Sequence, residues 1–313
     1  MLFRSKLEKQ NKDGKMQPSY YFCAYHCFGN PLAVSLKLNG LLMMWKIHQA
    51  KQTMKYADDT LLYFASDDVN IIESNLSSDL DSVTQWLSAN YLILNSTKSK
   101  IMLVGTHQRL ASKSFSISSN GRDLERLEKF KYLGVFMDPT LSLKSHINYL
   151  GKKISSRLGM LRRARKILPQ SSCIILYNAM ILPLFDYCSV VWDSCGAISK
   201  GYLDKLNGRA ASIILNRAVS ETDIIRILGW PNLQSRRDYL KCMLVFKSMN
   251  GLAPSYLLSD FTQAKKYHTY NTRHRDLIRL PLAKSTKYQG SFRYNGGCTF
   301  NNLPQSNKIA GKA

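Results

Sequence analysis

The stretch MKYADDTLLYFA, residues 54–65, decides the fold of the first half of the chain. Its two ends are rich in strand-forming residues, and two aspartates, Asp58 and Asp59, stand between them. Because aspartate favours turns by hydrogen-bonding to nearby backbone, the stretch predicts two short strands joined by a tight turn. Adjacent carboxylates on such a turn are the oxygen ligands that Mg²⁺ prefers. The stretch therefore predicts a hairpin that is also a candidate metal site.

A helix is expected directly after this hairpin, with Ser66 or Asp67 as its N-cap. Apolar residues there recur at three- and four-residue spacing and mark one buried face: Val69, Ile72, Leu76, Leu80, Val83 and Leu87. Further strands are predicted at residues 91–94, 100–104, 115–118 and 130–137, with a hairpin turn at Asn120-Gly121. Residues 32–47 fit either a strand pair or a short helix. The first half therefore alternates strand and helix, in an α/β or α+β pattern.

The second half is expected to be mostly helical. An apolar stripe of helical spacing covers residues 143–161, and helices are predicted at 172–182, 202–218, 221–228 and 233–249. No acidic residue occurs between Asp138 and Asp186, and eight cations surround the first of these stripes: Lys144, Lys152, Lys153, Arg157, Arg162, Arg163, Arg165 and Lys166. Such a helix suits the phosphate backbone of a nucleic acid, and an ordinary solvated face is the alternative.

Composition points the same way. The 313 residues contain 44 Lys and Arg against 21 Asp and Glu, a formal net charge of +23, while 45% hydrophobic residues suffice for a folded core. The expected partner is a polyanion, with nucleic acid first and an anionic membrane surface second. Seven scattered cysteines indicate reduced thiols in a cytoplasmic or nuclear protein that is not secreted. Cys23, His26 and Cys27 are poorly spaced for zinc, and no segment is expected to span a membrane.

Several motifs in order resemble the reverse transcriptase of non-LTR (LINE-type) retrotransposons, particularly jockey and CR1-like elements. The resemblance covers about residues 54–304 and rests on the following segments: Tyr56–Thr60; Asn90, Leu92, Asn95 and Lys98; Tyr132–Val135 with Asp138; Leu176–Pro183; Tyr187–Trp192; Arg236-Arg237; Asn250–Leu257; and Ser291–Pro304. It implies an α+β fold, in which a partial polymerase palm precedes a mostly helical thumb and C-terminal region. The expected domains are a leader outside the resemblance (1–53), the partial palm (54–138), a basic thumb-like region (139–219) and a helical C-terminal region with a basic tail (220–313).

The resemblance also implies roles for single residues. Asp58 would be the Mg²⁺ ligand with Asp59 beside it, and Lys98 would be a proton donor or phosphate contact. Tyr132, Leu133 and Gly134 would form the primer grip. The implied partners are an RNA template and a DNA primer, and the implied activity is RNA-directed DNA polymerisation. The oligomeric state stays open.

The family's palm needs another aspartate on an earlier strand, and it has a Pro/Gln/Gly-rich segment before the hairpin. Upstream of Tyr56 the only aspartate is Asp13, in a polar, Lys-rich stretch, and no PQG-type run occurs. Because phosphoryl transfer depends on positioning and electrostatics, we expect a truncated polymerase that is inactive alone. We also expect strand edges that residues 1–53 do not cover.

Two alternatives remain at this level. The chain could be a non-catalytic RNA- or DNA-binding remnant, whose affinity would depend steeply on salt and not on Asp58. It could instead be a structural or interaction protein whose charge serves solubility, with negligible RNA affinity at physiological salt.

Overall fold

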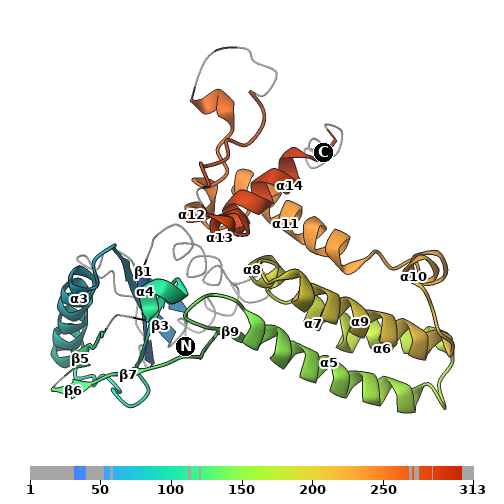
Figure 1. The fold of residues 1–313 in the computed structure, drawn as a ribbon, viewed down its shortest axis with the longest axis horizontal. Coiled ribbons are helices and arrows are strands. Elements are labelled where there is room, and N and C mark those ends of the chain that lie inside the picture. Colours follow the sequence, from blue (N-terminus) through green and yellow to red (C-terminus); the bar gives the residue numbers. More distant parts are fainter. Residues whose placement is uncertain are drawn as a thin grey trace, which may run out of the picture.

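The structure, a computed structural model, describes residues 32–39, 53–56, 59–111, 114–119, 121–267, 270, 275–283 and 285–304. A sheet with one long helix against it lies on one side of the molecule, and a set of helices extends from the other side (Figure 1). The α+β class that the sequence predicts is therefore confirmed. Among the described residues, no helix is both long enough and apolar enough to cross a membrane.

The sheet has five strands in the order β2-β3-β1-β4-β7. They are β1 (Leu32–Asn39), β2 (Thr53–Tyr56), β3 (Asp59–Ala65), β4 (Lys100–Gly105) and β7 (Glu125–Arg126). Neighbouring strands are antiparallel except β4 and β7, which are parallel. Because β2 and β3 pair from Tyr56 opposite Asp59, the predicted hairpin at residues 54–65 is confirmed.

Strand β1 lies in the interior of the sheet and pairs with two neighbours. In its register with β3, Asn39 is opposite Asp59, and in its register with β4, Lys37 is opposite Lys100. Residues 32–47 are expected from their sequence to form either a strand pair or a short helix. The part of this segment that the structure describes, residues 32–39, is a single strand. The expectation that residues 1–53 leave strand edges uncovered is wrong for β3 and β4, because β1 occupies their facing edges, and β2 and β7 are the edge strands of the sheet.

The side chains of β3 and β4 alternate between two cores, as the two-residue period of a strand requires. One face packs on α3 (Val69–Ala89) through Leu62, Ile101 and Leu103. The other face belongs to the larger core, which continues into the helical half, and contributes the following side chains: Leu61, Tyr63, Met102 and Val104. The sheet is therefore covered on both faces, and one core joins the two halves of the protein.

Helix α3 buries the six apolar residues that the spacing predicts. Its N-cap is Asp68, one residue later than expected, and the Asp68 carboxylate accepts a hydrogen bond from the Asn70 N–H at 2.9 Å. The predicted strand at residues 91–94 is wrong. After the helix C-cap at Asn90 the backbone turns at Tyr91, which has a φ of 57°, and this left-handed conformation breaks the extended path that a strand needs.

Short elements connect the sheet to the helical half. They are α4 (His107–Leu110), β5 (Ser118–Ser119), β6 (Arg122–Asp123), β8 (Phe130–Tyr132) and β9 (Val135–Met137). The expected turn at Asn120-Gly121 joins β5 to β6, and Gly121 supplies a φ of 73°, whereas Asn120 is outside the described residues. The single strand predicted over 130–137 is instead a hairpin, because Leu133 and Gly134 both adopt positive φ.

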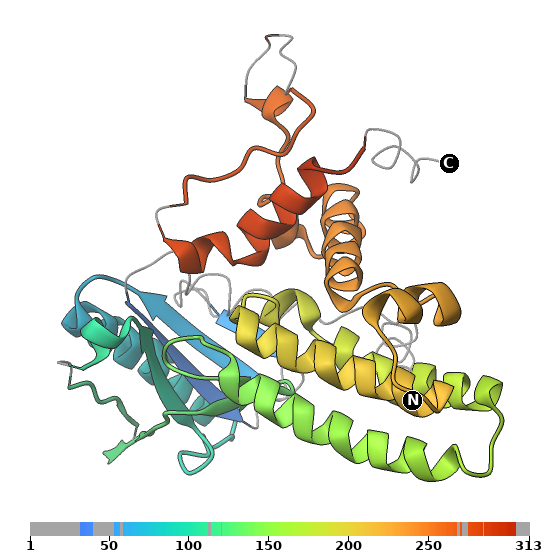
Figure 2. The same cartoon turned by 45° about the vertical axis from the view of Figure 1, so that its right-hand side comes forward.

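Two long helices, α5 (Lys144–Ala164) and α9 (Ala197–Leu215), lie side by side (Figure 2). The shorter helices α6 (Gln170–Met180), α7 (Leu182–Asp186) and α8 (Ser189–Trp192) connect them. The apolar stripe of α5 is buried as predicted. Pro183 stands in the first turn of α7, where its missing N–H has no helical partner to lose.

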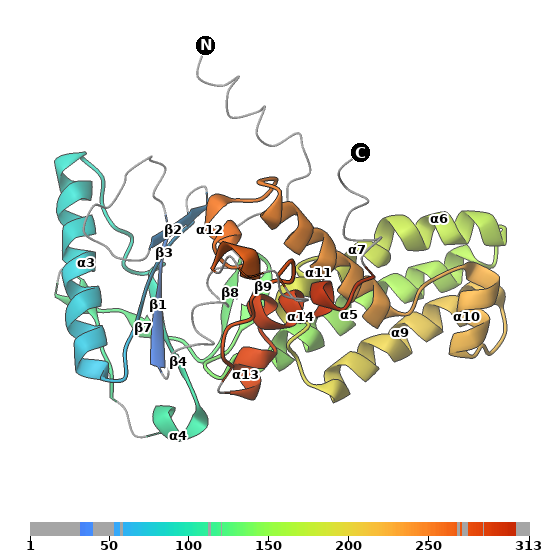
Figure 3. The same cartoon turned by 90° about the horizontal axis from the view of Figure 1, so that it is seen from above.

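Helices α10 (Glu221–Leu228) and α11 (Leu233–Met249) have the predicted bounds. The chain continues through α12 (Ser255–Leu258), a 3₁₀ turn (Ala264–Lys266), α13 (Thr286–Gln289), a π-helical turn (Phe292–Gly296) and α14 (Gly297–Asn301). Seen from above, α11, α12 and α14 lie between the sheet and the far ends of α9 and α10 (Figure 3). Their buried side chains belong to the same core as the sheet.

Candidate nucleic-acid interface

Of the two aspartates in the predicted catalytic hairpin, Asp59 is the one whose backbone the structure describes. Asp59 begins β3, pairs with Tyr56 across the turn and lies opposite Asn39 of β1. Asp58 is outside the described residues. Strand β1 and its other neighbour β4 contain no aspartate or glutamate, so neither of these described strands places another carboxylate beside Asp59.

Within the described strands of this sheet, Glu125 of β7 is the one carboxylate besides Asp59. β7 lies three strand spacings from β3, which is about 14 Å, and Glu125 forms an ion pair with Lys100. No group of three or more His, Cys, Asp or Glu side chains in the described part of the chain could hold a metal ion. The described residues therefore do not provide the three carboxylates that hold two metal ions in the family's palm.

Lys98 stands on the turn that precedes β4. The backbone N–H of Lys98 donates to the Asn95 carbonyl at 3.2 Å and to Asn95 Oδ1 at 3.1 Å, and its side chain is exposed. Because β1 and β4 are antiparallel, this turn lies at the end of the sheet where Asp59 begins β3. The role of Lys98 stays a prediction.

The predicted primer grip is the β8–β9 hairpin. Its two-residue turn consists of Leu133, with a φ of 44°, and Gly134, with a φ of 92°. Tyr187 holds the turn from the other side, because its hydroxyl donates to the Leu133 carbonyl at 2.8 Å and its ring lies against Gly134. The Tyr132 side chain is 1% exposed and belongs to the core, so only Leu133 and Gly134 form the tip of the hairpin.

Asp138 fixes the loop between this hairpin and α5. Its carboxylate accepts hydrogen bonds from the backbone N–H groups of Thr140, Ser142 and Leu143 and from two hydroxyls. Burial opposes ionisation, but the hydrogen bonds from Ser142, Thr140 and Leu143 outweigh it and hold the pKa of Asp138 below its usual range. The loop therefore fixes the position of the β8–β9 hairpin relative to the start of α5.

Three lysines and two aromatic rings form a continuous surface where the hairpin meets α5. We call these residues the lysine–aromatic platform: Lys129, Lys131, Phe136, Tyr149 and Lys153. The Nζ atoms of Lys129 and Lys131 lie 4.5 and 5.5 Å from the centre of the Phe136 ring. Those of Lys131 and Lys153 lie 5.0 and 4.9 Å from the centre of the Tyr149 ring. The two rings meet edge to face at 5.0 Å.

The platform is electropositive. The ammonium group of Lys153, partly offset by desolvation and assisted by Lys131, lowers the pKa of the Tyr149 hydroxyl. Among the described residues, no salt bridge joins Lys129, Lys131 or Lys153 to an acid. A half-buried aromatic pair surrounded by unneutralised cations can stack a base and hold the adjoining phosphates.

The cations predicted along α5 do not form one stripe. Lys153 and Arg162 are nine residues apart, about two and a half helical turns, so they lie on opposite flanks. Arg157 shares the platform flank with Lys153, and Lys166 lies near the Arg162 flank. Seven of the eight predicted cations are exposed. Arg165 is half-buried: its Nε donates to the Ile214 carbonyl at 2.9 Å and its Nη1 to the Leu168 carbonyl at 3.3 Å, so it joins α5 to α9.

The sequence prediction included Lys153 of the platform but missed the other four residues. The alternation of Lys129, Lys131 and Phe136 with buried residues along the hairpin is a detectable signal, because strand side chains that alternate with core residues lie on the outer face. Tyr149 is four residues before Lys153, the spacing of neighbours on a helix face. What spacing alone does not reveal is that these two faces meet.

Together the fold and this surface define a class of protein. A mixed sheet with an aspartate hairpin is joined, through the β8–β9 hairpin, to a basic helical region. Comparison with known proteins agrees. The family described as reverse transcriptase (RNA-dependent DNA polymerase) matches residues 26–137. This range contains β1 and extends into the segment that the motif resemblance leaves out.

Two relatives extend the similarity beyond that range. An RNA-directed DNA polymerase from the mobile element jockey of Drosophila melanogaster is 24% identical over 208 residues, which are 64% of this chain and 21% of the relative. A retrovirus-related Pol polyprotein from the type-1 retrotransposable element R1 of Bradysia coprophila is 25% identical over 187 residues, 56% of this chain and 18% of the relative. The resemblance to non-LTR retrotransposon reverse transcriptases is confirmed. The chain spans about a fifth of the length of these relatives.

Proposed function

We propose that this chain binds a primer–template nucleic acid on the β8–β9 hairpin and the platform flank of α5, as the nucleic-acid-holding part of an RNA-directed DNA polymerase. In this proposal residues 54–138 act as a partial palm, 139–219 as a thumb and 220–313 as a C-terminal region. The observation that carries it is the lysine–aromatic platform, which joins the proposed primer grip to the proposed thumb in one charged surface.

Three features of the platform favour nucleic acid. Its cations lack acidic partners among the described residues, so they remain available to neutralise phosphates and release counterions. Its rings offer an apolar surface that every base can contact. Beside the platform, a nucleic acid can approach the backbone of the Leu133-Gly134 turn more closely than it could approach a turn of bulkier residues. The Tyr187 hydroxyl holds that backbone in place.

The binding proposal predicts a matched difference between lysine variants. Lys131→Gln with Lys153→Gln should weaken binding to an RNA–DNA primer–template about tenfold near 0.1 M salt and lower the salt slope by about 2. Fluorescence anisotropy over a salt series measures both quantities. Lys205→Gln with Lys247→Gln removes the same charge from exposed sites on α9 and α11 and should change binding little. Equal effects of the two pairs would show that only overall charge matters.

We further propose that the chain does not polymerise on its own. The implied Mg²⁺ ions need three carboxylates, and the hairpin offers Asp58 and Asp59 beside two strands without acids. RNA-templated primer extension with Mg²⁺ should give no incorporation above that of Asp58→Asn, while both proteins still bind RNA. Incorporation by the unaltered chain that Asp58→Asn abolishes would contradict this proposal and would mean that a further carboxylate is supplied from elsewhere.

A further inference from the structure

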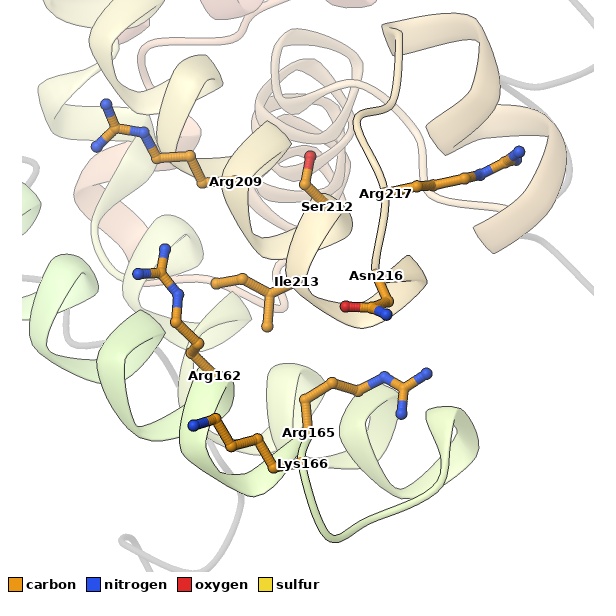
Figure 4. Close-up of a pocket in the computed structure, with 8 residues that line it drawn as sticks. All are labelled: Arg162, Arg165, Lys166, Arg209, Ser212, Ile213, Asn216 and Arg217. Carbon is orange, nitrogen blue, oxygen red and sulfur yellow. The ribbon is translucent and has the colours of Figure 1, made fainter.

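A basic pocket of about 680 Å³ opens between the last turns of α5 and α9, at the opposite end of α5 from the platform (Figure 4). It is lined by five cations and three other residues: Arg162, Arg165, Lys166, Arg209, Arg217, Ser212, Ile213 and Asn216. None of the described residues that line it is acidic. The side chains of Arg162, Lys166 and Arg209 reach to one side of the pocket, while those of Arg165 and Arg217 reach to the other.

Acidic partners for the cations of the first side are absent from the described residues. Within the part of the chain that the structure describes, no salt bridge involves Arg162, Lys166 or Arg209. On the other side, Arg165 is held by backbone carbonyls, and Arg217 feels the charge of Asp223, which itself pairs with Arg226 at 3.0 Å. The uncompensated charge is therefore concentrated on Arg162, Lys166 and Arg209.

Helix ends explain only part of this clustering. The carbonyl ends of α5 and α9 favour nearby cations, but this effect falls off within the last turn. Arg165 already bonds the Ile214 carbonyl at the end of α9. Arg209 lies six residues before the last residue of α9, beyond the reach of that helix end. Like charges placed together without such compensation repel each other, and an anion between them removes that repulsion.

We propose that Arg162, Lys166 and Arg209 hold two neighbouring phosphates of a nucleic-acid segment that is separate from the duplex on the platform. The inference rests on the proposed function. We take the segment to be separate because Arg162 lies on the flank of α5 opposite to Lys153 and about 14 Å further along the helix axis. Two phosphodiester groups carry a charge of −2 and therefore offset more of the charge of these three cations than one group would.

The test compares two double variants of equal charge. Arg162→Gln with Arg209→Gln removes the pocket cations, and Lys153→Gln with Arg157→Gln removes exposed cations from the platform flank of the same helix. The ligands are a blunt RNA–DNA duplex and the same duplex with a single-stranded RNA overhang. Tripolyphosphate serves as a small probe, read out as a shift in thermal unfolding.

The proposal expects the pocket variant to bind the blunt duplex like the unaltered protein, but to lose about tenfold in affinity for the overhang ligand, with a salt slope lower by about 1.4. It also expects tripolyphosphate to stabilise the unaltered protein and the platform variant but not the pocket variant. Unchanged overhang binding by the pocket variant, with weaker duplex binding by the platform variant, would overturn the pocket and leave the proposed function intact. If the unaltered protein binds neither nucleic acid, the proposed function itself fails.

Discussion

Replacing Asp193 with alanine should lower the free energy of unfolding by about 3–5 kcal/mol, the largest effect that we expect from a single polar side chain here. Asp193 follows α8 and is buried, with three cations around its carboxylate. Arg237 Nε and Lys241 Nζ lie 2.8 Å from its oxygens and Lys200 Nζ lies 2.9 Å away. The Arg237 and Lys241 side chains are each 3% exposed, so water cannot replace the lost partner.

The remaining contacts of the two cations do not restore neutrality. Lys241 also bonds Asn295 Oδ1 at 2.6 Å and pairs with Asp238 at 2.7 Å, and Arg237 Nη2 donates to Gln234 at 2.9 Å. Burial opposes the ionisation of Asp193, but Lys241 and Lys200 outweigh it and hold the pKa of Asp193 below its usual range. Without this carboxylate, an excess of positive charge would remain in the core that joins α8, α9 and α11.

Denaturant unfolding of Asp193→Ala measures the loss. Asp276→Ala is the control, because the Lys265–Asp276 pair has a similar separation of 3.0 Å but side chains that are 42% and 53% exposed, and its loss should cost at most about 1 kcal/mol. Adding Arg237→Met to Asp193→Ala should recover part of the stability, since Arg237 is then left with the neutral Gln234 as its hydrogen-bond partner and its charge is uncompensated. Strictly additive losses in that double variant would contradict a charge-based explanation.

Acidification from pH 6.5 to pH 4 should cost the folded state about 3 kcal/mol through His146 alone. Burial, assisted by the charge of Lys131, lowers the pKa of His146 from 6.5 to about 4. The folded state therefore binds fewer protons than the unfolded state in this range. Its stability is fully present above pH 6.5, falls as the pH drops and levels off below about 4.

The structure explains why the neutral ring is needed. His146 lies in the first turn of α5, and its Nδ1 accepts a hydrogen bond from the Phe136 N–H of β9 at 3.4 Å. A proton on Nδ1 would abolish this bond and place a buried charge near Lys131. Protonation should therefore loosen the joint between the β8–β9 hairpin and α5.

Unfolding experiments at several pH values between about 7.5 and 5.5 test the slope of this prediction above the range in which ordinary carboxylates titrate. His146→Gln should flatten the dependence of stability on pH, because glutamine can still accept a hydrogen bond but carries no titrating group. His107→Gln, at an exposed position in α4, should leave the dependence unchanged. If His146→Gln keeps the original slope, His146 is not the titrating group.

The sequence predicts elements well wherever one face of an element decides its position. The buried stripe of α3 follows from its period, and the bounds of α10 and α11 follow from period together with capping residues and glycine at their ends. The prediction of a strand at residues 91–94 failed because their composition suits a strand, while the backbone must turn at Tyr91 after α3 ends. The single strand at 130–137 failed because two adjacent positive φ angles include the non-glycine Leu133.

Of the candidate site, the sequence provided single residues and the structure provided their grouping. Lys153 and Arg162 are both basic residues of α5. The packing of α5 against the hairpin and against α9 places them in different proposed binding sites. The buried charges of Arg237 and Lys241 run against the usual exposure of such residues. No pattern in the sequence predicts Asp193 as their shared partner, because it lies more than 40 residues before both of them in the chain.

The position of β1 has a consequence for how the chain folds. Along the chain, only α3 separates β3 from β4. In the sheet, both strands pair with β1 and not with each other. The sheet therefore cannot close until residues 32–39, 59–65 and 100–105 have all met, which makes its contacts long-range and slow to form. The α5–α9 half also has long-range contacts, such as that of Arg165 with the Ile214 carbonyl, but its helices are built from local hydrogen bonds. We expect the helical half to become ordered first during refolding, and the sheet that contains the aspartate hairpin to be completed only when β1 inserts between β3 and β4.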